Sequence, residues 1–218
     1  LLAWGAEAEI AIWLQPAGPD SVAPLTPGAG PLTYRLDEGA LSLRFGPQDF
    51  VQVNADLNRR MIALALELLA PQPGERIADL FCGLGNFTLP LARRGAEVIG
   101  IEGDAGLIER ARANAAAHGL DVDWRVANLF DTAQLAALGD LDVRALLLDP
   151  PRAGAAEVVN SLPLQGVERI VYVSCHPGTL ARDAGTLVRE RGYQLVAAGV
   201  MDMFPHTSHV ESIALFQR

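Results

Sequence analysis

The 218-residue sequence contains no lysine, and its 17 cationic side chains, all arginine, are outnumbered by 26 carboxylates to give a net charge of −9. A basic surface is the usual electrostatic signature of a nucleic-acid binder, and the chain as a whole lacks one. Charge alone therefore favours an enzyme acting on a small molecule. A local arginine patch or a separate basic module would be needed to hold phosphates.

Cysteine is scarce and long apolar runs are absent. Cys82 and Cys175 are the only cysteines and do not form a Cys-x-x-Cys pair, which excludes a disulfide framework and makes the reducing cytoplasm the expected location. No apolar run is long enough for a transmembrane helix, so we expect no membrane partner. We also expect no metal site, and nothing in the sequence fixes an oligomeric state. Half of the residues are apolar, enough for a sizeable core.

From residue 54 onward, strand-like and helix-like segments alternate. Asn54 can cap a helix that runs to about Ala70. Strands are expected at Arg76–Phe81, Glu97–Ile101, Val122–Val126, Ala145–Asp149 and Arg169–Ser174, separated by helices at Phe87–Arg94, Asp104–His118, Thr132–Leu138 and Gly154–Leu162, and followed by a helix at Gly178–Arg191 and an antiparallel pair at Tyr193–Met201 and Val210–Gln217. Such alternation predicts an α/β fold whose seven-stranded, mostly parallel sheet carries helices on both faces.

The first 47 residues are less regular. Glu9–Leu14 has the composition of a strand, Pro16–Pro31 is rich in proline and glycine and is typical of a loop, and Tyr34–Phe45 predicts a hairpin around Asp37-Glu38-Gly39. We expect residues 1–47 to be the partly β remnant of a central or linker domain, and residues 48–218 to be the catalytic domain. The start at Leu1 indicates a fragment of a longer protein.

A glycine-rich segment, Asp79–Phe87, joins the first strand to its helix. Glycines allow a tight turn and close approach to a ligand, and the helix N-terminus offers free N–H groups. Glu102 ends the next strand, where a carboxylate can accept hydrogen bonds from both ribose hydroxyls. Thr88 replaces the third glycine of the dinucleotide fingerprint, which favours a nucleoside without a pyrophosphate. The alternative is a glycine turn that binds nothing.

Asp149-Pro-Pro-Arg152 follows the fourth strand, so Asp149 should face the same crevice as the glycine loop. Asp-Pro-Pro followed by an aromatic residue is typical of enzymes that methylate exocyclic amines. Arg152 stands in the aromatic position here and weakens that interpretation. A turn set by the two prolines is the structural alternative.

Cys175 precedes Pro177, a residue suited to the first helical position, so its sulfur should lie at a helix N-terminus that favours the thiolate. A lone cysteine is otherwise a small core residue. Glu211, near the start of the last strand, is the best candidate for a catalytic base, although a solvated glutamate is the simpler reading. His206 and His209 are weaker candidates.

Five segments occur in an order that resembles the RNA 5-methyluridine methyltransferases, over residues 48–218: Phe50–Asn54, Asp79–Phe87, Leu148–Arg152, Ser174–Pro177 and His209–Glu211. Gly85–Ala92 and Thr179–Asp183 are similar to the bacterial branch that acts on 23S ribosomal RNA at uracil 1939. The resemblance implies a Rossmann-like class I S-adenosylmethionine-dependent methyltransferase that methylates carbon 5 of a uridine in RNA. The RNA it implies is ribosomal, and the uridine would be flipped out of its stack.

The resemblance also implies roles for individual residues. Cys175 would attack carbon 6 of the uracil, and Glu211 would accept the proton from carbon 5. The S-adenosylmethionine contacts would come from Gln52, Phe81, Gly83, Asn86, Glu102, Asn128 and Asp149.

The sequence departs from the family in two ways. His176 stands where the family usually has asparagine. Full-length ribosomal members also carry an N-terminal oligonucleotide-binding barrel and a four-cysteine iron–sulfur cluster, which two cysteines cannot rebuild. We therefore expect a fragment that binds the cofactor but methylates RNA poorly, with any cluster confined to a missing N-terminal region. Two alternatives stay open: a non-covalent methyltransferase for another base or a small molecule, and a silent cofactor-binding scaffold.

Overall fold

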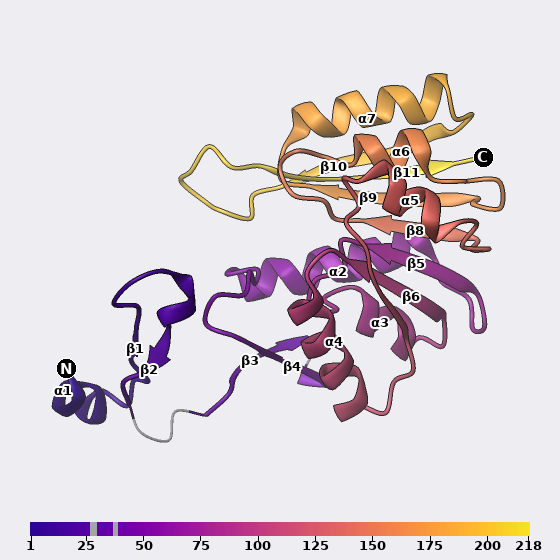
Figure 1. The fold of residues 1–218 in the computed structure, drawn as a ribbon. Coiled ribbons are helices and arrows are strands. Elements are labelled where there is room, and N and C mark those ends of the chain that lie inside the picture. Colours follow the sequence, from indigo (N-terminus) through magenta and orange to yellow (C-terminus); the bar gives the residue numbers. More distant parts are fainter. Residues whose placement is uncertain (27–29, 37–38) are drawn as a thin grey trace.

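The computed structural model describes residues 1–26, 30–36 and 39–218, and it centres on a sheet with the strand order β10-β11-β9-β8-β5-β6-β7 (Figure 1). The strands are β5 (Arg76–Leu80), β6 (Glu97–Glu102), β7 (Asp123–Val126), β8 (Ala145–Leu148), β9 (Arg169–Ser174), β10 (Gln194–Met201) and β11 (Glu211–Gln217). The first five are parallel, and β11 runs antiparallel to both β9 and β10. The predicted seven-stranded, mostly parallel sheet is confirmed.

Helices cover both faces of this sheet (Figure 1). One face carries α2 (Ala55–Leu69), α3 (Thr88–Arg93) and α4 (Ala105–Ala117), and the other carries α5 (Thr132–Leu138), α6 (Ala156–Ser161) and α7 (Pro177–Arg189). Successive side chains of a strand point to opposite faces. Ile77 therefore packs with Met61 of α2 in one core cluster, while Ala78 packs with Val158 of α6 in the other. No helix in the described part of the chain is long and apolar enough to cross a membrane.

The N-terminal segment differs from the sequence prediction. It contains α1 (Leu2–Glu7), β1 (Trp13–Leu14), a 3-10 turn (Pro19–Ser21) and β2 (Ala23–Pro24). The strand expected over Glu9–Leu14 shrinks to the two residues of β1, which pair with β2 inside the segment predicted to be a loop. A strand two residues long holds its partner weakly, and the Thr26 hydroxyl adds a hydrogen bond from the Ile12 backbone N–H at 3.0 Å.

The hairpin predicted over Tyr34–Phe45 is present as β3 (Leu32–Leu36) and β4 (Leu41–Phe45). Residues 27–29 of the predicted loop, and Asp37 and Glu38 of the hairpin turn, lie outside the described residues. The side chains of Leu36, Leu41 and Leu43 are fully buried in the same cluster as α2 and α4. The predicted boundary at residue 47 thus falls after a hairpin that shares the core of the catalytic domain.

Candidate active site

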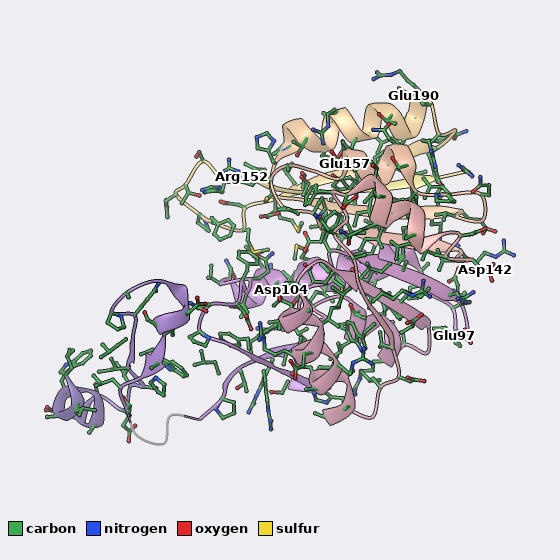
Figure 2. The ribbon with its side chains drawn as sticks, viewed as in Figure 1. Glu97, Asp104, Asp142, Arg152, Glu157 and Glu190 are labelled. Atoms are coloured by element: carbon green, nitrogen blue, oxygen red, sulfur yellow. The ribbon has the colours of Figure 1, made fainter. Side chains whose placement is uncertain are left out.

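A cavity of about 470 Å³ opens where the strand order reverses, beyond the carboxyl ends of β5 and β8. Ligands of open parallel sheets bind at this kind of reversal. Figure 2 shows Arg152 and Asp104 at this edge, with Glu97 and Asp142 at the opposite edge. Eight of the nine predicted site residues line the cavity, namely Gln52, Phe81, Gly83, Asn86, Glu102, Asp149, Cys175 and Glu211. The structure therefore brings these eight residues together from six separate segments.

Asn128 is the exception, because it is not among the lining residues. Its carboxamide oxygen accepts a hydrogen bond from the backbone N–H of Phe130 at 3.0 Å, and its own backbone N–H donates to Gln134 at 2.8 Å. This turn places the Phe130 ring in the cavity, 5.5 Å from the ring of Phe81. Asn128 thus supports the turn that carries Phe130, and its contact with the cofactor stays a prediction.

The glycine-rich loop follows a strained path around the cavity. Phe81 has φ of +65°, uncommon for a residue with a side chain, and Gly85 has φ of +94°. A Cβ at Gly85 would also collide with Leu89 of α3. Glu102, at the end of the neighbouring strand β6, holds the loop through its carboxylate, which accepts a hydrogen bond from the backbone N–H of Gly83 at 3.2 Å. The same carboxylate also accepts from the backbone N–H of Gly103 at 2.7 Å.

The side chain of Asn86 is bound by the protein itself. Asn86 and the buried Asn58 exchange two amide hydrogen bonds of 3.0 Å each, and the Tyr34 hydroxyl donates to Asn86 at 3.4 Å. Asn86 therefore helps to fix the loop, and it also lines the cavity. Sequence reasoning missed Tyr34, which lines the cavity from β3, and Asn58. A polar residue beside Met61 and Ile62 on the buried face of α2 was the available signal for Asn58.

Two carboxyl groups near the cavity have raised pKa values: Asp149, which is half-buried and lines it, and Asp79, which is fully buried outside the lining. Burial raises the pKa of Asp79 to about 7, although Thr88 donates a hydrogen bond to this side chain. Burial also raises the pKa of Asp149 to about 8, and the nearby charges of Asp79 and Glu211 add to the effect. The second oxygen of Asp79 and the side-chain oxygen of Gln52 are buried and have no hydrogen-bond partner in the described part of the chain. A ligand that donates hydrogen bonds or carries positive charge would relieve these costs.

Cys175 and Glu211 meet because β9 and β11 are antiparallel neighbours. Ser174 ends β9 opposite Ser212 of β11, which leaves the next residue of each strand, Cys175 and Glu211, at the cavity. Only 4% of the Glu211 surface is exposed, and burial raises the pKa of its carboxyl group.

The sulfur of Cys175 is partly buried. Its burial raises the thiol pKa, and the charges of Glu211 and Asp149 raise it further, while Arg152 acts in the opposite direction. This differs from the expectation that the helix N-terminus favours the thiolate. Burial and two carboxylates outweigh the helix terminus and the arginine.

His176 explains how the departure from asparagine is accommodated. It is the N-cap of α7, where its Nδ1 accepts a hydrogen bond from the Thr179 backbone N–H at 3.2 Å. Asparagine side chains satisfy helix N-termini in the same way. His206 and His209 are exposed in the segment between β10 and β11 and do not line the cavity.

A sheet whose last strand is inserted antiparallel, with a nucleoside-sized cavity at the reversal of strand order, is the architecture of Rossmann-like class I S-adenosylmethionine-dependent methyltransferases. Within that class, the chain belongs to the tRNA (uracil-5-)-methyltransferase family, whose model matches residues 33–218.

Named relatives agree with this placement. The 23S rRNA (uracil(1939)-C(5))-methyltransferase RlmD of Xanthomonas oryzae is 58% identical over the whole chain, and that of Azoarcus sp. is 59% identical over 96% of it. The chain spans about half the length of these curated relatives, 49% in both cases. Among solved structures, the tRNA (uracil-54, C5)-methyltransferase of Pyrococcus abyssi, in complex with S-adenosyl-L-homocysteine, matches with a TM-score of 0.77 and 30% identity over 94% of this chain and 50% of that one.

Proposed function

We propose that the protein transfers a methyl group from S-adenosylmethionine to carbon 5 of a uridine in RNA, with Cys175 as a covalent nucleophile. The observation that carries the proposal is the convergence of Cys175 and Glu211 on the cavity that the glycine-rich loop also lines. The names of the relatives support a ribosomal substrate. Both cysteines are free, as expected for a reducing compartment such as the cytoplasm. A uridine in RNA would have to leave its stack to reach this cavity.

The residues present fit S-adenosylmethionine. The rings of Phe81 and Phe130 offer an apolar wall for adenine, and Glu102 at the end of β6 is placed to accept hydrogen bonds from ribose hydroxyls. The unpartnered buried oxygen of Gln52 and the carboxyl group of Asp149 suit the amino-acid portion, which brings hydrogen-bond donors and a positive charge that favours the ionised carboxylate. When bound, the cofactor supplies an electrophilic methyl group on a cationic sulfonium, whose charge offsets the surrounding carboxylates.

The chain then supplies the nucleophile and the base. Cys175 loses its proton to solvent at the cavity mouth, and its sulfur adds to carbon 6 of the uracil. The electron pair of the double bond moves to carbon 5, which would form the new bond to the methyl group as the methyl–sulfur bond breaks and S-adenosylhomocysteine is left. Glu211 takes the proton from carbon 5, and the electrons released restore the double bond and expel the sulfur. Because burial raises the pKa of Glu211, this carboxylate is a stronger base than an exposed glutamate.

Trapping with 5-fluorouridine tests the covalent step. Fluorine at carbon 5 cannot be removed as a proton, so the protein with S-adenosylmethionine and fluorinated 23S ribosomal RNA should form a complex that survives denaturation. Cys175→Ser should abolish this complex, whereas Cys82→Ser should preserve it. Methylated ordinary RNA without a trapped complex would instead support a non-covalent methyltransferase. If neither methylated product nor trapped complex forms, the results would support a cofactor-binding scaffold.

A further inference from the structure

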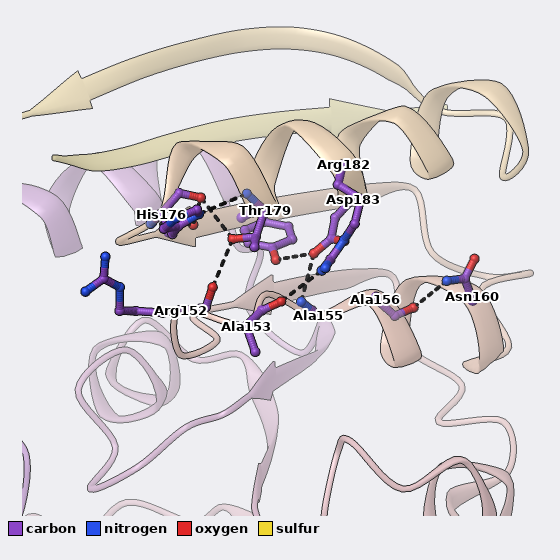
Figure 3. A network of polar contacts seen from close by, with 11 residues as sticks. Arg152, Ala153, Ala155, Ala156, Asn160, His176, Thr179, Arg182 and Asp183 are labelled. Atoms are coloured by element: carbon purple, nitrogen blue, oxygen red, sulfur yellow. Dashed lines mark hydrogen bonds and ion pairs between the residues drawn. The ribbon is translucent and has the colours of Figure 1, made fainter. Parts of the chain in front are cut away.

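The loop that follows β8 is fastened to α7 by a buried carboxylate. Asp183 of α7 has 1% of its surface exposed, and one of its oxygens accepts hydrogen bonds from the Tyr172 hydroxyl at 2.6 Å and the Ala155 backbone N–H at 2.8 Å (Figure 3). The other oxygen accepts from Arg182 at 2.8 Å. Tyr172 belongs to β9, so this single carboxylate ties a strand, a helix and the loop together.

Two further bonds hold the same loop. The Thr179 hydroxyl lies between two carbonyl oxygens, that of His176 at 2.9 Å and that of Arg152 at 3.3 Å (Figure 3). The Arg182 guanidinium donates to the carbonyl of Ala153 at 2.9 Å. Gly154 allows the close contact, because a Cβ there would lie 2.7 Å from an Asp183 oxygen and 2.9 Å from the Thr179 Cβ. The loop thus contacts α7 at Arg152, Ala153 and Ala155, and Gly154 between them has no room for a side chain.

The fastened elements carry the reacting groups. The loop begins at Asp149 and includes Arg152, and both line the cavity. Cys175 lies two residues before α7 and lines it too. The β8–β9 pairing ends at Leu148, and Asp149 keeps one backbone hydrogen bond to β5, from its N–H to the Leu80 carbonyl at 3.4 Å. The distance between the rest of the loop and the sulfur therefore depends on how the loop sits on the helix.

We propose that Asp183 is a positioning residue for the methyl transfer, which sets the placement of Asp149 and Arg152 relative to Cys175 without touching the substrate itself. The inference rests on the proposed function for its activity readout. A small displacement of reacting groups can slow an enzyme as much as ~100-fold without loss of binding. Substrate binding in the adenosine part of the cavity, built by Phe130 and Glu102, should be unaffected because these residues contact neither the loop nor α7.

We call the contact between the loop of residues 149–155 and α7 the joint. Two variants disturb this joint, one from each side. Asp183→Asn removes the negative charge of the carboxylate that accepts these hydrogen bonds. Gly154→Ala inserts a methyl group between the loop and α7. Glu190→Gln makes the same chemical change as Asp183→Asn at an exposed position on the end of α7. Gly192→Ala is matched to Gly154→Ala, because Gly192 also has positive φ, +76°, but nothing within 4 Å of a new Cβ.

We expect Asp183→Asn and Gly154→Ala to slow single-turnover methylation of RNA at least ~10-fold. The Kd for adenosine, which lacks the amino-acid portion that Asp149 faces, should stay within about twofold. Both controls should retain the rate. The pH profile of Cys175 alkylation by iodoacetamide should shift in the two joint variants and not in the controls, since it reports the charges around the sulfur.

Each outcome decides the question. Unchanged rates and alkylation profiles in folded joint variants would overturn the proposal. A parallel loss of rate, adenosine affinity and thermal stability would also overturn it in favour of a purely structural role. If the unmodified protein methylates no RNA, the proposed function fails, and the alkylation profiles alone then decide whether Asp183 places the charged loop beside Cys175.

Discussion

The Ser212 hydroxyl donates a hydrogen bond of 3.1 Å to the backbone carbonyl of Ser174, and this bond locks the register that places Glu211 beside Cys175. The two strands are separated by more than thirty residues in the chain, including α7 and β10. A shift of one residue in this register would turn Glu211 to the other face of the sheet. The base and the nucleophile are therefore paired by strand order rather than by sequence proximity.

Glu211→Gln should stop the reaction after methyl transfer. The amide cannot accept the carbon 5 proton, so the covalent complex with ordinary RNA should persist and turnover should fall at least ~100-fold. A denaturing gel that separates free protein from the RNA adduct measures this. Normal turnover in Glu211→Gln would show that another group removes the proton. His209→Ala, which alters an exposed residue, should leave turnover intact.

Asp149→Asn should change how stability depends on pH. The folded pKa of about 8 lies above the ordinary value of 3.8, so between these values the folded protein holds a proton that the unfolded chain has released. Stability of the unmodified protein therefore falls as pH rises through this window. Asparagine cannot ionise, and the variant should gain about 1–2 kcal/mol relative to the unmodified protein between roughly pH 5 and pH 8.

Thermal unfolding of both proteins across that window measures the difference. An equal pH dependence of the two melting temperatures would contradict the raised pKa. Glu157→Gln, a change to an acidic residue in the first turn of α6, provides the matched control.

His176→Asn should preserve stability, whereas His176→Ala should lower the free energy of unfolding by about 1 kcal/mol, because alanine cannot cap α7. Urea denaturation of the three proteins gives these values, and His206→Ala serves as an exposed control. Equal stability of His176→Ala and the unmodified protein would contradict a capping role. A loss in His176→Asn as large as in alanine would show that the imidazole does more than cap.

Asn58→Ala should weaken cofactor binding although Asn58 does not line the cavity. The change leaves the Asn86 amide without its reciprocal partner and should cost about 1–3 kcal/mol of stability. The glycine-rich loop then loses its anchor, and we expect the Kd for S-adenosylhomocysteine, measured by calorimetry, to rise several-fold. Tyr34→Phe removes only the longer bond of 3.4 Å and should have a smaller effect. Unchanged affinity in Asn58→Ala would argue against anchoring.

Local sequence determined much of the fold and most of the site. The alternation of apolar strands and capped helices is a property of neighbouring residues, and so is the glycine-rich turn before α3. Residues that follow parallel strands meet at one edge of the sheet whatever the details of packing, which is why Glu102, Asp149 and Cys175 could be predicted to line one cavity.

The failures of prediction lie where partners are distant in the chain. Tyr34, which the sequence did not predict as a site residue, reaches the cavity from a hairpin that the sequence assigned to a separate unit. The helix N-terminus predicted a lowered thiol pKa for Cys175, whereas burial and nearby carboxylates raise it. A helix terminus is visible in the sequence, but the carboxylates that outweigh it come from other strands.

The sequence by itself determined the order of elements and the kinds of chemical groups at the strand ends, because both depend on interactions within a few residues. Only the tertiary structure decided which groups face each other, how deeply Asp79 and Glu211 are buried, and that Asp183 fastens the Asp149 loop to α7. Burial and pairing between distant segments depend on the packed chain as a whole, and they set the charge state and the spacing on which this chemistry depends.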